Sequence, residues 1–421
     1  MHRPLRETMR ECELNDVVLV KVCFCDPDYL PSNHMLTQAN KVRALYFLVF
    51  SCTASWLPIF ADHLKAQGLT GIEISVVLSA TPVMMLLIQP WYGALADKIG
   101  IRKCLIASTL FAALSFLLFL LQGEFLFLIG ATIAMSVFYN ALQPLLDSVT
   151  LGLVQEQPNL NYGSLRLAGA AGWAATGIIV GYFITSINTS VIFIVSSLSL
   201  LLAFFIALSL NDFRVDSNSI APEKQNLQAV LKNKMLLYLL TAVLLVSIGA
   251  TTIWNFYSIY MKEIGASPTW VGYGLSFQGL CELPLFFLSA VIIHRLGIKT
   301  TLLVTLAATT LRLFLYSWVN NPQWAIAIEL LHGISWSLFW VVCVESVNSL
   351  VPQQWRATGQ SVLYAVYFGA GQIAGNFWTG WLYDQQISIG RIFMLNGILV
   401  AVVAVLCAVF IRLGNQPNSV S

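Results

Sequence analysis

Charge is scarce in this chain. Only 10% of its 421 residues are charged, whereas 57% are hydrophobic, and the mean hydropathy is +0.76. A water-soluble protein needs far more polar surface than this composition supplies, so a soluble enzyme or binding protein is excluded. The composition predicts an all-α membrane protein instead, because backbone groups in hydrocarbon must pair within their own helix.

The sequence motifs of membrane-bound enzymes and pumps are also missing. The five histidines are not clustered, no paired Asp-rich motifs are present, and no glycine-rich phosphate loop precedes a lysine and a serine. The eight cysteines predict neither a metal site nor a disulfide framework. We therefore expect no enzyme activity, no cofactor, no metal and no nucleic-acid partner.

Apolar segments long enough to span a bilayer, about 20 residues each, recur twelve times along the chain. They lie near 43–65, 72–94, 103–122, 125–153, 164–187 and 189–210, and near 235–262, 269–292, 300–319, 323–350, 357–383 and 388–412. The sequence thus predicts twelve transmembrane helices in two six-helix bundles. The predicted divisions are a cytoplasmic tail at 1–42, bundles at 43–210 and 235–413, a cytoplasmic loop at 211–234 between them, and a cytoplasmic tail at 414–421.

The two predicted bundles are related by an internal repeat. The stretch KIGIR at 98–102 returns as RLGIK at 295–299, and DSV at 147–149 returns as ESV at 345–347, each about 200 residues later. Two related bundles side by side are typical of transporters in which access to a midplane site alternates between the two membrane faces.

Basic residues fall mainly on one side of the predicted bundles. If the N-terminus is cytoplasmic, the opposite side holds only Lys65, Lys262 and Arg391, while Arg166 and Arg312 lie within the membrane. The positive-inside rule therefore predicts a multi-pass protein of the cell (cytoplasmic or inner) membrane with both termini cytoplasmic.

The first forty or so residues stand apart from this pattern. Their apolar stretch at 17–20 is too short to span and has no small-residue cleavage site after it, so the segment predicts a disordered tail and no secretory signal peptide. Met35 lies just before the first span and is an alternative start of translation.

The loop between the second and third spans reads GALADKIGIRK at 93–103. Gly93 would let two helices approach, Asp97 would cap and pair at a helix end, and Gly100 would allow a tight turn. With Lys98 and Arg102, these residues resemble the signature loop of the major facilitator superfamily, which implies a conformational gate. An ordinary basic cytoplasmic loop is the alternative.

A second resemblance lies in the fourth and fifth spans. Asp147 follows Pro144 by three residues, and the next span contains Arg166, a small residue and Trp173. This pattern is similar to that of the lactose permease branch of oligosaccharide and proton symporters, and to the related phenylpropionate permeases. The resemblance implies that Asp147 and Arg166 pair with each other or with substrate hydroxyls, and that Trp173 offers a flat face to a sugar ring.

Four ionisable residues lie deep in the second set of spans: Glu282, Arg312, Glu329 and His332. A central Asp or Arg in a bilayer costs at least ~2.5 kcal/mol on insertion scales, so such residues indicate function. The lactose permease family likewise has an acid in helix eight, an arginine in helix nine and a histidine with an acid in helix ten. The resemblance implies that this group couples protons and holds the sugar site.

The order of the helix-ten pair departs from that family. Here Glu329 precedes His332, whereas in the family the histidine comes first. The two residues still share a helix face, but the proton-carrying role does not transfer directly, so Glu282 and Glu329 are both candidates, with Arg312 as counter-charge. A static ion-pair network that only fixes helix packing is the alternative.

The sequence as a whole predicts a proton-driven symporter of a small polar organic solute, such as a sugar, an oligosaccharide or a nucleoside. The predicted solute-binding residues are Asp147, Arg166, Trp173, His332 and Trp336. An aromatic carboxylate as solute, an exporter, and a membrane sensor without transport remain alternatives. The expected partners are the solute, protons and membrane lipid, and the expected state is a monomer.

Overall fold

The computed structural model describes residues 33–121, 123–157, 160–211 and 233–411, and this part of the chain is helical with no β-strand. The chain divides into Met1–Thr37, of which only the start of the first helix is described, and Gln38–Ser421, to which all that follows refers. The predicted tails and the central loop thus fall largely outside the described residues, whereas Met35, the alternative start, lies within the first helix, Asn33–Trp56.

The first half of the described chain contains eight α-helices and one 3₁₀ turn. They are α1 (Asn33–Trp56), α2 (Phe60–Ala66), α3 (Gly71–Ile99), α4 (Ile101–Leu117), η1 (Leu118–Leu120), α5 (Phe125–Tyr139), α6 (Leu142–Glu156), α7 (Tyr162–Ser186) and α8 (Val191–Leu208).

The second half is interrupted more often. Its elements are α10 (Lys234–Glu263), α11 (Pro268–Leu296), α12 (Ile298–Trp318), α13 (Pro322–Ile328), η2 (Glu329–Leu331), η3 (Gly333–Leu338), α14 (Phe339–Leu350), η4 (Gln353–Trp355), α15 (Arg356–Tyr364), η5 (Ala365–Gly371), α16 (Gln372–Asp384) and α17 (Ile389–Phe410). η3 and η5 are π-helical turns.

Eleven helical segments among the described residues are long and apolar enough to cross a membrane. They coincide with eleven of the predicted spans. The remaining one, predicted at 357–383, is helical as α15, η5 and α16 in succession, and is more polar because it contains Gln360, Gln372 and Asn376. With this segment included, the predicted all-α fold of two six-helix sets is confirmed.

The internal repeat is visible in the backbone. Gly100 (φ +101°) joins α3 to α4, and Gly297 (φ +79°) joins α11 to α12 at the corresponding place. Gly68 (φ +87°) and Gly265 (φ +83°), just before α3 and α11, form a second such pair. Positive φ costs glycine little, which explains this residue at all four turns. Only the first pair follows from the repeated pentapeptide in the sequence.

The basic residue after each repeated turn caps the last helix of its half. Arg102 donates to the carbonyl of Leu208 at the end of α8 (2.7 Å), and Lys299 donates to the carbonyl of Ala408 near the end of α17 (2.9 Å). A cation at a helix C-terminus satisfies free carbonyls and complements the helix dipole. The repeated pentapeptide therefore builds the same turn and cap twice.

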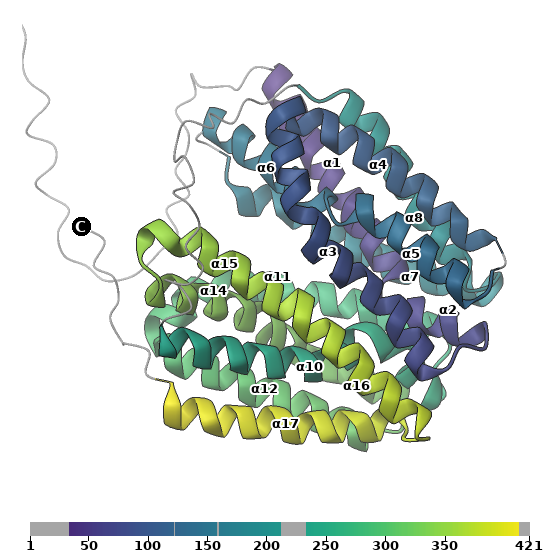
Figure 1. Ribbon diagram of the computed structural model, residues 1–421, viewed down its shortest axis with the longest axis vertical. Coiled ribbons are helices and arrows are strands. Elements are labelled where there is room, and N and C mark those ends of the chain that lie inside the picture. The colour runs from purple at the N-terminus through teal and green to yellow at the C-terminus, as the bar shows by residue number, and fades with distance from the viewer. Residues whose placement is uncertain (1–32, 122, 158–159, 212–232, 412–421) are drawn as a thin grey trace, which may run out of the picture. The chain divides into compact units, whose positions relative to one another are not determined.

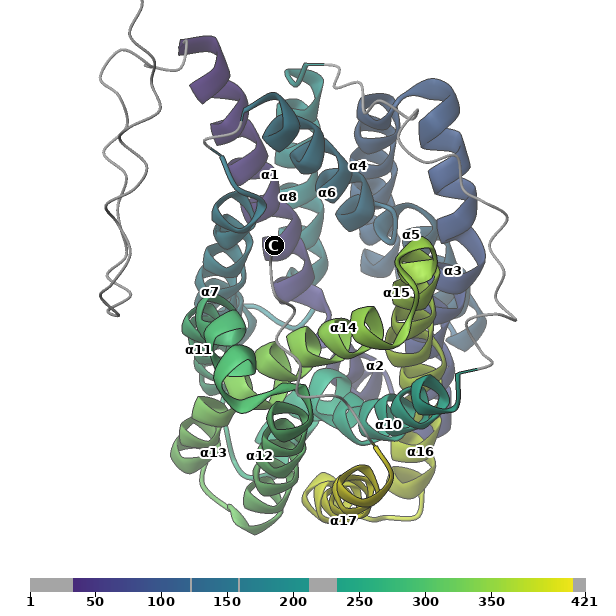
Figure 2. The same cartoon turned by 90° about the vertical axis from the view of Figure 1, so that its left-hand side faces the viewer.

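The two halves meet along two helix pairs, α7 with α11 and α3 with α16. Figure 1 shows the halves converging toward the end that carries α2 and separating toward the end that carries α6 and α15. Figure 2, seen from the latter end, places α1, α4, α6 and α8 on one side and α10, α12 and α17 on the other. We name these two ends the sealed end and the diverging end.

The sealed end is closed at the α3–α16 pair by backbone contact. A side chain at Gly71 would collide with the backbone of Gly380, and the reverse also holds. The Asp384 carboxylate accepts from the backbone N–H groups of Gly71 (2.5 Å) and Ile72 (2.9 Å). Asp384 of one half therefore caps the N-terminus of α3 in the other half.

The α7–α11 pair is closed in a similar way. A side chain at Gly272 would meet the backbone of Gly177 and Gly181, and the Ser276 hydroxyl donates across the pair to the carbonyl of Ala174 (2.6 Å). Small residues that permit close backbone approach are typical of helix contacts in membranes.

Two further contacts cross between the halves at the sealed end. Lys262 of α10 forms an ion pair with the buried Asp62 of α2 (2.7 Å), and the Lys65 ammonium lies 4.8 Å from the ring centre of Tyr383. The sealed end thus combines tight backbone packing with cross-half charge contacts.

Replacement of Gly272 by valine should force α7 and α11 apart. Overpacking of this kind costs about 1–3 kcal/mol, so we expect a clearly lower thermal unfolding midpoint for the detergent-solubilised protein. Gly130→Val is the matched control, because a side chain at Gly130 meets nothing within 4 Å. Equal midpoints for the two variants would contradict the close contact of these helices.

Candidate functional site

The buried charges predicted in the second half form one hydrogen-bonded cluster. Arg312 of α12 forms an ion pair with Glu329 of η2, whose second oxygen accepts from the Tyr316 hydroxyl (2.5 Å). Arg312 also donates to the same hydroxyl oxygen (3.2 and 3.3 Å). Both oxygens of the Glu329 carboxylate are therefore occupied by protein donors.

His332 joins this pair to a second carboxylate. Arg312 Nη1 lies 2.8 Å from His332 Nδ1, and His332 Nε2 lies 2.8 Å from a carboxylate oxygen of Glu282 on α11. Arginine can only donate, so Nδ1 must accept and carries no proton. The imidazole is consequently neutral, with its proton on Nε2, where it donates to Glu282.

The two carboxylates differ in their access to solvent. The side chains of Glu329, Arg312 and His332 are 0%, 3% and 2% exposed, whereas that of Glu282 is 22% exposed. Glu282 is therefore the accessible end of the hydrogen-bonded chain, and Glu329 is its closed end. In the described part of the chain, no group of three or more His, Cys, Asp or Glu residues could hold a metal ion.

Irregular helix geometry brings these side chains together. The helix that carries the pair changes from α13 to the 3₁₀ turn η2 at Glu329 and then to the π turn η3 at Gly333. A side chain at Gly333 would collide with the carbonyl of Cys281, so glycine allows η3 to lie directly on α11 beside Glu282. π turns inside helices are frequent at functional sites.

An aromatic wall continues from the cluster. It consists of Trp254, Trp336, Trp340, Tyr364, Tyr367 and Phe368. The Trp254 ring lies 5.7 Å from the His332 ring and 4.9 Å from that of Trp336, and Tyr364 at the far end is 39% exposed. Because η3 and η5 contribute Trp336, Tyr367 and Phe368, both π turns of the second half lie at this wall.

Of the two partners expected for Asp147 and Arg166, each other or substrate hydroxyls, the direct pair is absent in this conformation. Asp147 accepts from the hydroxyls of Tyr46 (2.6 Å) and Tyr162 (2.9 Å), and Arg166 donates to the Tyr162 oxygen (2.8 Å). Among the described residues no ion pair joins the two charges. Tyr162 lies between them because it can donate to the acid while it accepts from the base.

Trp173 lies at the α7–α11 contact. Its indole N–H donates to the carbonyl of Leu275 (3.1 Å), and its ring is the nearest group to Gly279, one turn before Glu282. The only polar atom of this side chain therefore holds the two halves together. A stacking role for its ring face remains a prediction.

Arg166 also reaches the second half electrostatically. It lies near enough to Glu282 and Tyr364, both of the other half, for a long-range charge interaction, but among the described residues it forms no hydrogen bond or ion pair with either. Glu282 therefore experiences two guanidinium groups, Arg166 from the first half and Arg312 from its own half. The predicted solute-binding and proton-coupling residues thus come together around Glu282, apart from Trp173, which lies at the neighbouring α7–α11 contact.

The predicted gate loop is only partly as expected. Gly100 makes the turn, but Gly93 is exposed and a side chain there would meet nothing within 4 Å, so the close helix approach is absent. Asp97 and Lys98 are exposed, and within the described ranges Asp97 forms no ion pair. The physical reason is that the halves separate toward the diverging end, where this loop lies (Figure 1).

Sequence reasoning missed the tyrosines of the site. Tyr316 follows Arg312 by four residues and Tyr162 precedes Arg166 by four, so each arginine has a tyrosine on its own helix face at the spacing at which side chains meet. That spacing could have identified both. Tyr46 carries no local signal, because it reaches the site from α1.

Comparison with known proteins gives one family. Residues 40–395 match the model of the MFS_1 like family. The maltose permease of Geobacillus stearothermophilus is 26% identical over 359 residues, covering 84% of this chain and 89% of that protein. The sucrose permease of Escherichia coli is 27% identical over 386 residues (84% and 89%), and the probable 3-phenylpropionic acid transporter of Escherichia coli (strain K12) is 25% identical over 360 residues (83% and 93%).

Solved structures show the same fold. The crystal structure of the nucleoside transporter NupG superposes with a TM-score of 0.79 at 14% identity, covering 90% of this chain and 100% of that one. A bacterial homologue of the human lysosomal transporter Spinster, inward-facing and unoccupied, gives a TM-score of 0.71 at 11% identity, covering 89% and 96%.

Neutralising the two carboxylates of the cluster should have unequal effects on stability. Glu329→Gln leaves the buried Arg312 without its counter-charge, which costs about 3–5 kcal/mol when one partner of a buried pair is lost. Glu282→Gln should cost much less, because that side chain is partly exposed. Thermal unfolding of the two detergent-solubilised variants checks this, and equal losses would contradict the distinction between the closed and accessible ends.

Proposed function

This chain belongs to the MFS_1 like family of membrane transporters, in the lactose permease branch, and from that premise we propose that it is a proton-coupled symporter of a small polar solute. The observation that carries the proposal is the hydrogen-bonded chain of Arg312, His332 and Glu282, whose accessible acid lies beside the aromatic wall. In the proposed function, the solute crosses the membrane without chemical conversion.

Glu282 is the proposed proton carrier. It is accessible, and it is the acid on which arginines of both halves act. Protonation would remove the negative charge of Glu282, which attracts Arg166 of the first half. The proton would therefore weaken the attraction between the two halves at the site. This links proton binding to the rocking of the halves.

Glu329 has a positioning role in this proposal. Its two oxygens are taken up by Arg312 and Tyr316, and its side chain has no exposed area. The pair fixes the guanidinium, which in turn fixes the His332 tautomer. Of the two candidate carriers, Glu329 therefore positions Arg312 and does not exchange a proton itself.

A sugar or oligosaccharide fits the surroundings of this acid best. Flat indole rings such as Trp336 suit the apolar faces of a sugar ring, while Arg166, Asp147 and His332 supply donors and acceptors for hydroxyls. The names of the maltose and sucrose permeases support this solute class for a related chain. A nucleoside has the same combination of a flat ring and hydroxyls.

An aromatic carboxylate is the second candidate. The Arg166 guanidinium lies 5.9 Å from the ring centre of Phe50 and acts on Tyr364, so a cation is surrounded by aromatic groups. A phenyl carboxylate would match such a site, and one relative is a probable 3-phenylpropionic acid transporter.

The proposed orientation follows from the basic residues. The loops at the diverging end carry Lys98, Arg102, Lys103, Arg295 and Lys299, so the positive-inside rule places this end in the cytoplasm of a cell-membrane protein, with both termini on the same side. The sealed end then faces outward and the structure is the inward-facing state. In the opposite state, the loop at 93–103 would meet the other half and act as a gate.

A proton-flux assay tests the proposed function. The full-length protein is reconstituted in liposomes, and lumenal pH is recorded while sugars, nucleosides and aromatic acids are added in turn. Acidification with one class supports proton symport and identifies the solute. Silence across the panel, with the protein shown to be folded, would overturn the proposal.

Glu282→Gln should separate coupling from translocation. Without a titratable group at this position, uphill uptake should be lost, whereas exchange of labelled solute across the membrane should continue. Glu124→Gln, at an exposed acid before α5, is the control and should transport normally. A Glu282→Gln protein that still concentrates its solute would refute the coupling role.

A further inference from the structure

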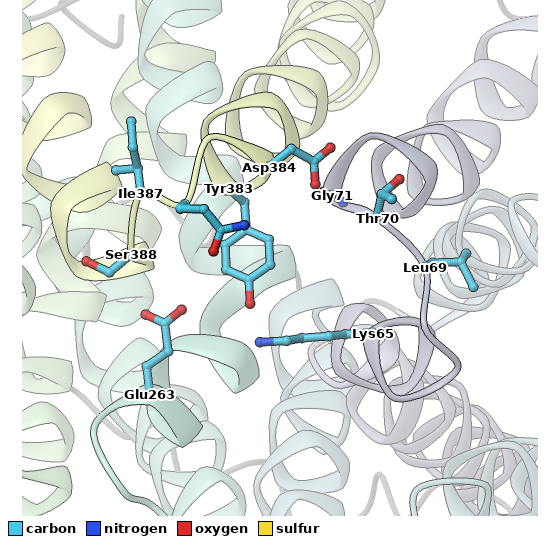
Figure 3. A pocket seen from close by; sticks show the side chains of 10 residues that line it. Lys65, Leu69, Thr70, Gly71, Glu263, Tyr383, Asp384, Ile387 and Ser388 are labelled. Carbon is cyan, nitrogen blue, oxygen red and sulfur yellow. Dashed lines mark hydrogen bonds between the residues drawn. The ribbon is translucent and has the colours of Figure 1, made fainter.

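A pocket lies at the sealed end, away from the buried cluster of Arg312, Glu329, His332 and Glu282. Its volume is about 340 Å³, within the range of small-ligand pockets. Figure 3 shows Lys65, Leu69, Thr70 and Gly71 of the first half facing Glu263, Tyr383 and Ser388 of the second. The pocket is therefore built from both halves.

Several polar groups of this pocket have unused hydrogen-bonding capacity. Glu263 accepts from the backbone N–H of Ile389 through one oxygen (2.9 Å), which leaves the other oxygen for a ligand. The Lys65 ammonium lies over the Tyr383 ring and, in the described part of the chain, forms no hydrogen bond or ion pair. Figure 3 shows the Lys65 and Glu263 side chains extending toward each other across the open space.

The backbone of the pocket is strained at one residue. Gln386 has φ +61°, the only positive φ of a residue other than glycine among those described. It lies two residues after the end of α16, at a position where glycine is the usual choice. The other four positive-φ turns in the described chain are all glycine, so the glutamine keeps a side-chain amide in the pocket at a cost in backbone energy.

The charges of the pocket select against a ligand that carries charge of one sign only. Lys65 and Glu263 carry opposite charges on facing walls, and the Asp384 carboxylate is already satisfied by the N-terminus of α3. An anion would face Glu263 and a cation would face Lys65. A neutral molecule with several hydroxyl groups can donate to the carboxylate and accept from the ammonium and the Gln386 amide.

We propose that this pocket is a second solute site, for a neutral polyhydroxylated molecule, and that its occupant holds the sealed end closed. Because the walls come from both halves, the pocket is complete only when Asp384 caps α3 across them. A ligand that binds one conformation better shifts the equilibrium toward it. If the occupant is also the transported solute, it slows its own transport, and this part of the proposal rests on the proposed function. Binding to the pocket does not depend on the proposed function.

Hydrogen exchange of the first turn of α3 tests the site. The full-length protein in lipid nanodiscs is exposed to D-glucose, D-glucosamine or D-gluconate, and exchange is followed in the peptide that covers 71–76. At glucose near twice its dissociation constant, exchange should slow about threefold, as mass action requires for a ligand that binds only the closed state. The charged analogues should protect less.

Two variants and a control locate the effect. Gln386→Gly relieves the strained φ and removes the amide, and Lys65→Met removes the ammonium, so both should lose the protection by glucose. Gln385→Ala changes the neighbouring exposed residue, which does not line the pocket, and should keep it. Any one of three results would overturn the proposal. Glucose could fail to protect the unmodified protein, the charged sugars could protect it equally, or Gln386→Gly could keep full protection.

The outcome is independent of the transport assay. Protection that depends on Gln386, together with a silent proton-flux panel, would keep the second site and reject the proposed function. Proton symport of a panel member without such protection would keep the function and reject the site.

Discussion

The ion pair between Arg312 and Glu329 is the interaction on which the rest of the site depends. An arginine cannot shed its charge, so in hydrocarbon it must be matched by an acid and surrounded by acceptors. The Tyr316 oxygen on the same helix, and Glu329 and His332 Nδ1 on the neighbouring one, provide these acceptors. The cost of leaving this arginine unmatched restricts where η2 can lie, and the π turn that follows packs closely on α11 through Gly333.

The two halves are held by a different kind of contact from the one that organises the site. Between the halves, glycines and serines bring backbones together and few side chains need to be ordered, so the contact can open and close without rebuilding a core. Within the second half, charged hydrogen bonds fix side chains in one arrangement. The surroundings of Glu282 are therefore rigid, and movement takes place at the α7–α11 and α3–α16 contacts between the halves.

Much of this organisation could be read from the sequence. Glu282, Arg312, Glu329 and His332 were recognisable because ionisable residues are rare in apolar spans, and the repeat identified the turns at Gly100 and Gly297. The direct Asp147–Arg166 contact, one of the two partners that the family resemblance implied for these charges, is absent because Tyr162 intervenes. Tyr46 carries no such signal, because it reaches the site from another helix. Neither the sealed end nor the strain at Gln386 could be predicted, since the first depends on how separate helices meet and the second on the course of one backbone turn.

The tautomer of His332 has a consequence for energy conservation. A histidine between two acids could pass a proton from one to the other, but here its Nδ1 is occupied by a guanidinium that neither gives up nor takes a proton. Under proton coupling, a proton on Glu282 has no onward route through the imidazole to Glu329. The cluster then offers the proton no second exit, and a proton on Glu282 can leave only toward the side to which Glu282 is open.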